Sequence, residues 1–478
     1  MTTAAPEEQR KTELSESPVE AEPAPSPARV ADAPSDVRWV LVWTAIGLAI
    51  RAIHALWLHP LGDYLWSDMG GHFYTAQRFA AHGHVSGRMD VIKPRAMSFV
   101  GGLILHQFGQ GNLGKQMWGL LQVLLSTATL PLAFVGARRF FGRRSARIAI
   151  VVLALDALSI SFAGFLMVET YAMFCLALTF ALLDPERPWR TLWAGAALGL
   201  AGLFKPQILL VVPLWCLLLL LWPSGPAGSL FAWLRERRRV AAVLLGVGVL
   251  AVVLPETIAV SRIVGRPTLL SAYSGQNFYV GHCNVMNTIM TSGPGDYFTA
   301  GVPKVYERNE PWPDVTFKVS VFDSDFYFRE GMKCWRKSFW ASALWSVEQL
   351  ADVFAGWPGS TIDPFPIPGG WGSLPRYFGV TLEYLFVPLA FMGLWQWRRE
   401  LGAWVGFGAP MGSIWGLALV FSGDPRYREP FDVFIVAAAA GGLGALIDRF
   451  KPAIVRWIAA RLAKKVGDPR LPNQADVS

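Results

Sequence analysis

Long stretches of almost uninterrupted apolar residues recur along most of this chain. A helix needs roughly 20 mainly apolar residues to cross the hydrocarbon core of a bilayer, so such runs predict membrane-spanning helices. The composition agrees, because 53% of the 478 residues are hydrophobic and only 16% are charged, which is unusual for a soluble domain. We predict an all-α polytopic membrane protein with about ten spans. The expected spans are 39–58, 114–136, 147–165, 167–183, 191–204, 207–223, 240–261, 377–396, 401–421 and 430–448.

The basic residues predict the orientation of these spans. They collect in short clusters between apolar runs, so the net charge of +8 does not indicate a nucleic-acid partner. Basic clusters mark the cytoplasmic side of membrane proteins. Here they fall in alternate connections, at 138–147, 187–190, 235–239 and 398–399. This alternation predicts that both termini are cytoplasmic and that the long polar segments face the other side of the membrane.

The chain divides into five parts on this topology. We expect the first part to be disordered, because it is rich in Pro, Ala, Glu and Ser and nearly lacks aromatic residues. The outer loop of the second part has room for two short helices lying on the membrane surface. The five parts are a cytoplasmic tail (1–37), an N-terminal transmembrane module (38–261) with an outer loop (59–113), an outer-face extramembrane segment (262–376), C-terminal transmembrane helices (377–449) and a basic cytoplasmic tail (450–478).

Charged residues beside the span ends on the expected outer face are the candidates for chemistry. Asp68 follows the first span and opens a short helix, which an acid would also cap. Glu169 falls at an outer turn, where it is either solvated or directed into a cavity. Lys93 meets either a lipid headgroup or a substrate phosphate. Arg426 and Arg428 lie in a tight turn before the last span, and guanidinium groups suit phosphate.

Other patterns exclude several kinds of site. All seven histidines fall on or near the expected outer face, but their spacing matches no metal-binding motif. We therefore predict no cofactor, while a divalent metal is left open. The sequence has no phosphate-binding GxxxxGK[ST] loop and no dinucleotide-binding glycine pattern, which argues against a nucleotide domain. Cys283 and Cys334 share one polar segment on the expected oxidising side and are the pair placed to form a disulfide.

Four short motifs, taken in order, resemble a known family. They are SDMGGHFY (67–74), VIKPRAMSF (91–99), FLMVETYAMF (165–174) and GDPRYREPF (423–431). In this order they resemble the GT-C superfamily of membrane glycosyltransferases, in the branch of the protein O-mannosyltransferases and lipid A aminoarabinose transferases (glycosyltransferase family 39-like). GQNFYVGHCN (275–284) also looks like a motif that follows the middle span in bacterial members. The likeness covers about residues 39–450.

The resemblance implies a fold, an activity and a set of site residues. It implies a GT-C-type helical bundle in a bacterial inner membrane that transfers a sugar, with inversion, from a polyprenyl-phosphate donor to a glycan, lipid or protein acceptor. Asp68 would be the catalytic carboxylate and Glu169 would assist it. The residues expected to hold the donor phosphate are Lys93, Arg426, Arg428 and, less strongly, Lys205. The residues expected in the substrate pocket are His72, Tyr74, Tyr427 and Asn277.

One departure from the family and three alternatives bear on this interpretation. Many relatives carry a second acid directly after the first, whereas Met69 follows Asp68 here, which argues against protein O-mannosylation. An oligosaccharide ligase with a lipid diphosphate donor would have a similar cationic pocket. A transporter or flippase would use such charges as gates, but would also carry polar positions at the middle of several spans. A noncatalytic scaffold is the third alternative.

Overall fold

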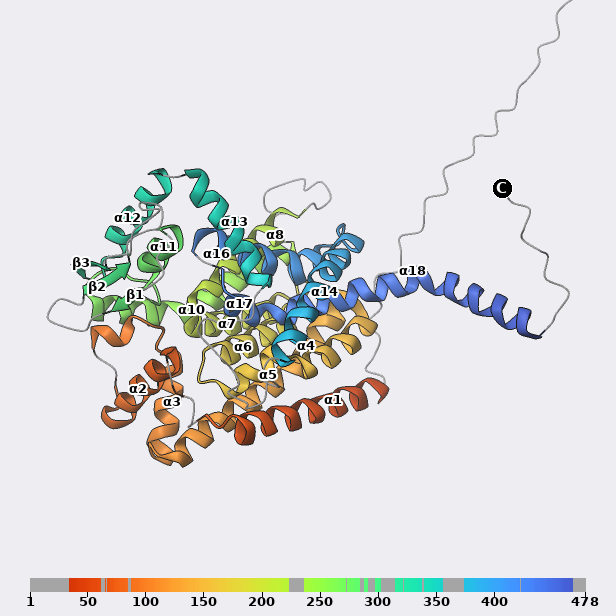
Figure 1. The fold of residues 1–478 in the computed structure, drawn as a ribbon, viewed down its shortest axis with the longest axis horizontal. Coiled ribbons are helices and arrows are strands. Elements are labelled where there is room, and N and C mark those ends of the chain that lie inside the picture. Colours follow the sequence, from red (N-terminus) through yellow and green to blue (C-terminus); the bar gives the residue numbers. More distant parts are fainter. Residues whose placement is uncertain are drawn as a thin grey trace, which may run out of the picture.

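Helices make up nearly all of the computed structural model (Figure 1). The structure describes residues 34–61, 65, 67–84, 87–222, 236–271, 273–283, 288–290, 297–301, 314–320, 322–337, 339–355, 374–421 and 423–466. The first part of the chain forms α1 (Pro34–Ile53), η1 (His54–Leu58), α2 (Ser67–His82), η2 (Arg88–Val91), α3 (Ala96–Phe108), α4 (Asn112–Leu155), α5 (Ala157–Gly164), α6 (Glu169–Leu182), α7 (Pro188–Phe204), η3 (Pro206–Leu210) and α8 (Val211–Leu221). The second part forms α10 (Arg237–Val264), α11 (Ser274–Cys283), β1 (Thr288–Met290), β2 (Tyr297–Gly301), β3 (Asp314–Ser320), α12 (Ser324–Lys337), α13 (Phe339–Ala355), α14 (Leu374–Gln396), α15 (Leu401–Ala403), η5 (Trp404–Gly408), α16 (Ala409–Val420), α17 (Pro425–Arg428), η6 (Glu429–Phe431) and α18 (Asp432–Val466).

Within the described ranges, five helical stretches are long and apolar enough to cross a membrane. They are Ser35–Leu58, Asn112–Leu155, Arg237–Val264, Leu401–Val420 and Arg426–Ala459. Shorter apolar helices accompany them at Ala96–Phe108, Glu169–Leu182, Pro206–Leu221 and Tyr384–Gln396. The protein is therefore an integral, polytopic, helical membrane protein, which confirms the predicted fold class.

The element α4 reverses direction at Gly142. This residue has a φ of 86°, a left-handed conformation that glycine adopts at little cost. The guanidinium of Arg51 donates to the hydroxyl of Ser126 at 2.7 Å and to the carbonyl of Leu153 at 2.9 Å. In a straight helix those two residues would lie about 40 Å apart, so the two halves of α4 run antiparallel. The reversal accounts for the two apolar runs that the sequence shows in this region.

Ion pairs gather the basic residues at one end of the helical bundle. Asp36 is almost fully buried and pairs with Arg143 at 2.8 Å and Arg147 at 2.6 Å. Arg144 pairs with Asp448 of α18 at 2.5 Å. Because Asp36 has these partners, α1 begins at Pro34, inside the tail predicted to be disordered; the tail residues 1–33 lie outside the described residues. We call the end of the bundle that contains Asp36, Arg143, Arg144, Arg147 and Asp448 the basic end.

The core of the bundle surrounds α6, which packs between α4 and α7, while α18 packs on both α4 and α14. Large aromatic side chains fill it, and Trp118, Trp215, Phe180 and Phe434 are completely buried. The indole N–H groups of the two tryptophans find acceptors, since Trp118 donates to the hydroxyl of Tyr171 and Trp215 to the carbonyl of Val405, both at 2.7 Å. This packing fixes the α6 N-terminus, where the candidate site lies.

The helices α2, α3, α11 and α12 lie at the end of the bundle away from the basic end (Figure 1). A second, smaller core joins η2 and the end of α10 to α11 and α12, and in it Val91 and Ile92 pack with Tyr279 and Tyr327. The loop between α1 and α4 and the segment after α10 therefore form one structural unit. This unit also contains a three-stranded antiparallel sheet in the order β1-β2-β3, an element that the sequence did not predict.

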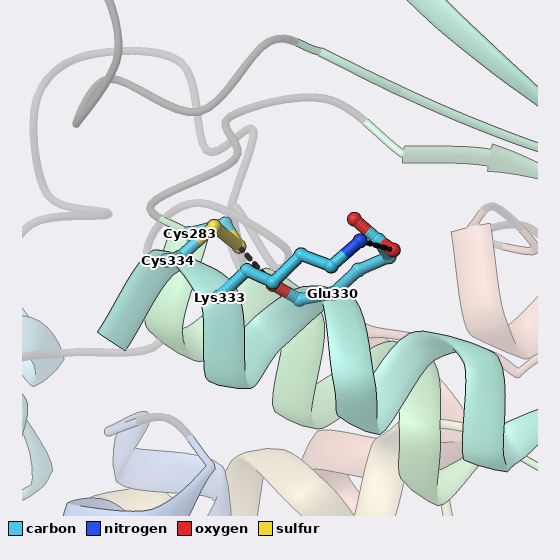
Figure 2. The surroundings of a disulfide bond; sticks show 4 residues. All are labelled: Cys283, Glu330, Lys333 and Cys334. Atoms are coloured by element: carbon cyan, nitrogen blue, oxygen red, sulfur yellow. Dashed lines mark hydrogen bonds and ion pairs between the residues drawn. A yellow bond between two sulfur atoms is a disulfide. The ribbon is translucent and has the colours of Figure 1, made fainter. Parts of the chain in front are cut away.

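A disulfide between Cys283 and Cys334 links α11 to α12 (Figure 2). The bond confirms the pair expected from the sequence. Both cysteines are buried in the smaller core, and the nearby ion pair between Glu330 and Lys333 lies on the exposed side of α12. The remaining cysteines, Cys175 and Cys216, are free thiols in the bundle.

Candidate functional site

Helix α2 presents two of the predicted site residues on one face. Asp68 lies in its first turn and His72 follows one turn later, and residues four apart share a helix face. Tyr74 lies on another face, where its side chain is 67% exposed and the guanidinium of Arg78 sits 5.9 Å from its ring centroid. The structure therefore separates Tyr74 from the other two residues.

Lys93 reaches Asp68 from the turn between η2 and α3. The Lys93 Nζ lies 2.5 Å from Oδ1 of Asp68, and the two side chains are 36% and 38% exposed. A carboxylate and an ammonium group are thus held together at a position that a ligand from outside can reach.

Arg426 brings the C-terminal part of the chain to the same point. It lies in the four-residue helix α17, whose start is fixed by the Arg426 N–H donating to the Asp424 carboxylate at 2.8 Å. The Arg426 guanidinium donates through Nη1 to Oδ2 of Asp68 at 3.1 Å and through Nε to Oε1 of Glu169 at 3.2 Å. One arginine therefore joins the two acids that the sequence singled out.

A second cation lies beneath Arg426. Lys205 follows α7 and donates to Oε1 of Glu169 at 3.0 Å and to the Arg426 carbonyl at 2.6 Å. Its Nζ also lies 5.2 Å from the centroid of the Tyr427 ring, within the range of a cation–π attraction. Glu169 is completely buried and Lys205 nearly so, so this pair forms the floor of the site. We call Asp68, Lys93, Glu169, Lys205 and Arg426 the ion-paired cluster.

The cluster keeps Asp68 ionised. Burial alone would raise the pKa of the Asp68 carboxyl, but the charges of Lys93 and Arg426 outweigh burial and hold that pKa well below its usual range. Burial also favours the neutral form of the neighbouring His72 imidazole. Together with the charge of Lys93 it lowers the pKa of His72 to about 4, against the opposing effect of Asp68. The site thus offers a carboxylate next to a neutral imidazole.

Two other predicted residues lie outside the cluster. Arg428 is fully buried and donates to the Asp432 carboxylate at 3.0 Å and to the Val353 carbonyl at 3.5 Å. Arg426, two residues earlier in the sequence, pairs with Asp68 and Glu169 instead. Asn277 is half-buried on α11, where its N–H donates to the Tyr273 carbonyl. Arg428 therefore connects α13 to α18, and its place in the fold differs from that of Arg426.

The sequence did not single out a second ion pair beside the cluster. Arg95 donates two hydrogen bonds to Glu256 of α10, both at 2.7 Å. Two signals were available: Arg95 lies in the same motif as Lys93, and Glu256 is an acid inside a long apolar run. Among the described residues, no three or more His, Cys, Asp or Glu side chains are grouped so as to hold a metal ion.

Fold and site together define a polytopic helical membrane protein with a charged cluster at one end of its bundle. No protein-family model and no curated protein matches the chain. Solved structures do match. The oligosaccharyltransferase AglB from Archaeoglobus fulgidus, in complex with an inhibitory peptide and a dolichol-phosphate, matches with a TM-score of 0.51 and 12% identity over 92% of this chain. The aminoarabinose transferase ArnT from Cupriavidus metallidurans, bound to undecaprenyl phosphate, matches with a TM-score of 0.38 and 18% identity over 88% of this chain and 81% of its own.

The match to AglB shows the fold. AglB is a membrane glycosyltransferase of the GT-C superfamily, so the chain has a GT-C-type fold and the resemblance seen in its motifs is confirmed at that level. The chain spans only about half of AglB, 53% of its length.

Proposed function

We propose that the protein is a glycosyltransferase that moves a sugar from a polyprenyl-phosphate donor to an acceptor hydroxyl, with inversion at the anomeric carbon. The observation that carries this proposal is the ion-paired cluster. It combines an ionised, half-exposed carboxylate with cations on both of its oxygens. A general base and an anion-binding group are the two parts that displacement of a phosphate leaving group requires.

Each part of the cluster has a role in this reaction. The Asp68 carboxylate accepts the proton of the acceptor hydroxyl while the hydroxyl oxygen bonds to the anomeric carbon. The bond from that carbon to the phosphate oxygen breaks, and its electron pair leaves with the lipid phosphate. Lys93 and Arg426 stabilise the charge that develops on this phosphate. Glu169 and Lys205 position Arg426: Glu169 accepts a hydrogen bond from its guanidinium, and Lys205 donates one to its carbonyl.

The donor also prepares Asp68 for catalysis. In the structure both Asp68 oxygens are occupied, one by Lys93 and one by Arg426. A donor phosphate competes for the same two cations and so frees the carboxylate to meet the acceptor hydroxyl. We therefore expect the donor to bind before the acceptor.

The charge of the cluster favours a monophosphate donor over a diphosphate. Two carboxylates and three cations leave one positive charge in excess when all five groups are ionised. A sugar joined to a lipid through one phosphate carries one negative charge, whereas a diphosphate carries two. The AglB structure, whose fold this chain shares, holds a dolichol-phosphate.

The positions of the charges support an orientation. The basic end carries Arg138, Arg143, Arg144 and Arg147, and the cluster lies at the other end of the bundle. Because basic clusters mark the cytoplasmic side, we place the cluster on the non-cytoplasmic face and both termini in the cytoplasm of a bacterial cell. A transporter would need charges at the middle of the membrane, whereas these gather at one end.

Two measurements test the function. Mass spectrometry of lipids that copurify with the protein identifies the donor, and transfer from that donor is then measured with glycan, lipid and protein acceptors.

Asp68→Asn keeps the side-chain shape but accepts no proton, so transfer should fall roughly 100- to 10,000-fold while donor binding persists. Arg426→Ala should chiefly weaken donor binding. Normal transfer by Asp68→Asn with loss in Glu169→Gln would reverse the two acids' roles, and normal transfer by both would refute the proposal.

A further inference from the structure

The turn that carries Lys93 is held from both sides by the region around the end of α10. On one side, the hydroxyl of Ser271 donates to the carbonyl of Ile92 at 2.6 Å. On the other side, the guanidinium of Arg95 donates to both carboxylate oxygens of Glu256. Lys93 and Pro94 lie between these two anchors, so the position of the ammonium group depends on both.

The pair between Arg95 and Glu256 has the geometry of a fixed contact. Both hydrogen bonds measure 2.7 Å, which is the two-pronged arrangement that gives an arginine–carboxylate pair a defined direction. The side chains are only 20% and 23% exposed, so water competes less for this pair than for one on the open surface. Glu256 lies on α10, a helix that packs against α7 in the bundle. The pair therefore ties the turn to a rigid part of the fold.

Displacement of Arg95 is transmitted to Lys93 through a short, stiff link. The single residue between them is Pro94, whose ring fixes its own φ and restricts the residue before it. Arg95 is also the residue from which α3 starts. Loss of the Glu256 contact thus moves the start of α3 and, with it, the Lys93 ammonium group that lies 2.5 Å from Asp68.

We propose that Arg95 and Glu256 are positioning residues for the lipid phosphate: their ion pair holds Lys93 where it binds the phosphate of a polyprenyl-phosphate ligand. This inference rests on the proposed function. Arg95 and Glu256 carry opposite charges, so the pair adds no net charge to the ion-paired cluster. Its contribution is the placement of Lys93, and placement errors of about 1 Å can cost on the order of 100-fold in rate.

The test is a double-mutant cycle on affinity for a probe lipid. The dissociation constant of undecaprenyl phosphate is measured by microscale thermophoresis with the full chain in detergent, for the wild type, Lys93→Ala, Arg95→Ala and the double variant. Lys93→Ala should weaken binding about 10-fold or more, as expected for loss of a charged hydrogen bond. Arg95→Ala should weaken it roughly 5-fold in the wild type and less than about 2-fold in the Lys93→Ala background.

A charge reversal and a matched control complete the experiment. Arg95→Glu alone should weaken binding, and the double reversal Arg95→Glu with Glu256→Arg should restore much of it. Arg266→Ala removes a half-exposed arginine–carboxylate pair with Asp323 at the same end of the protein, 3.4 Å in length, and should leave affinity unchanged. Thermal unfolding of each variant identifies any that fail to fold, and Arg95→Lys then replaces Arg95→Ala in the cycle.

The outcomes separate this inference from the function beneath it. Equal effects of Arg95→Ala in both backgrounds, or no effect in the wild type, would overturn the positioning role while leaving the proposed function intact. A wild type that binds no lipid phosphate, or a Lys93→Ala variant that binds it normally, would remove the phosphate role of Lys93 and the inference with it.

Discussion

Arg426 donates a hydrogen bond to the Asp68 carboxylate across 358 residues of sequence, at 3.1 Å. The same guanidinium pairs with Glu169, so one side chain closes a site built from the beginning, middle and end of the chain. The two acids differ sharply in their surroundings. Asp68 is 38% exposed, whereas Glu169 is completely buried and paired with Lys205 and Arg426. Substitutions at these two positions should therefore have different effects on stability.

Glu169→Gln is expected to destabilise the fold as well as reduce transfer. Without the Glu169 carboxylate, the buried Lys205 loses its charged partner, and breaking a buried pair from one side costs about 3–5 kcal/mol. Asp68→Asn lies in a more exposed position and should change stability far less. The measurement is chemical unfolding of the purified variants in detergent. The double variant Glu169→Gln with Lys205→Met should recover part of the loss, and an unfolding midpoint like that of the wild type for Glu169→Gln would contradict this assignment.

Arg428→Ala is expected to reduce stability and leave the intrinsic affinity for lipid phosphate unchanged. Arg428 is fully buried and paired with Asp432, so its removal breaks a buried ion pair from one side, again at about 3–5 kcal/mol. Arg426→Ala should show the opposite pattern, with a large effect on affinity. Unfolding midpoints and titration with undecaprenyl phosphate distinguish the two. A loss of affinity in folded Arg428→Ala equal to that in Arg426→Ala would show that both arginines bind the phosphate.

The sequence predicted the helical membrane fold because apolar runs report burial in lipid directly. It also predicted which charged residues form the site, since its candidates include Asp68, Lys93, Glu169, Lys205 and Arg426, which are joined by ion pairs. Each of them departs from its surroundings, as a charged residue beside an apolar run. The order of the motifs related Asp68, Lys93, Glu169 and Arg426 to one another, and the shared fold agrees with it; Lys205 lies outside the motifs.

The sequence could not distinguish Arg426 from Arg428, because their directions depend on how the short helix α17 packs. It likewise gave no reason to separate Tyr74 from His72, which lie two residues apart but on different faces of α2. The pair between Arg95 and Glu256 was missed because its partners come from distant segments, and only the packing of η2 against α10 brings them together. The small sheet was missed because its strands are short.

The disulfide is expected to stabilise the unit formed by α11 and α12. Its cysteines are 51 residues apart, and closing a loop of that length in the unfolded chain is worth about 4 kcal/mol in the chain-entropy description. The double variant Cys283→Ser with Cys334→Ser should unfold at a lower temperature than the wild type and lose its response to reductant. Cys216→Ala removes a free thiol and serves as the control. An unchanged wild-type unfolding temperature after reduction would contradict the prediction.

The proposed orientation predicts opposite labelling of the two ends. Single cysteines at Lys333 and at Asp448 provide a matched pair, because both native side chains are 66% exposed. In a background lacking Cys175 and Cys216, an impermeant maleimide should label the Lys333→Cys variant in intact cells. It should label the Asp448→Cys variant only after the membrane is opened. The reverse pattern would place the ion-paired cluster in the cytoplasm.

The last prediction concerns pH. Burial lowers the pKa of His72 to about 4, with Lys93 acting in the same direction and Asp68 opposing it. In the unfolded chain the imidazole has a pKa of about 6.5, so between these values the unfolded state binds a proton that the folded state does not. The free energy of unfolding should therefore fall as the pH drops through this window, by up to about 3 kcal/mol.

The variant His72→Gln isolates this contribution. Asp68 does not obscure it, because a carboxyl with a lowered pKa loses its stabilising effect only below about pH 4. Unfolding midpoints measured at pH 7.5, 6 and 5 on the wild type should decline, and the decline should be shallower in His72→Gln, which carries no imidazole to protonate. His84→Gln, at an exposed position just after α2, serves as the matched histidine-to-glutamine control. Identical slopes for His72→Gln and the wild type would mean that His72 is already protonated in the folded protein, and that the imidazole beside Asp68 carries a charge.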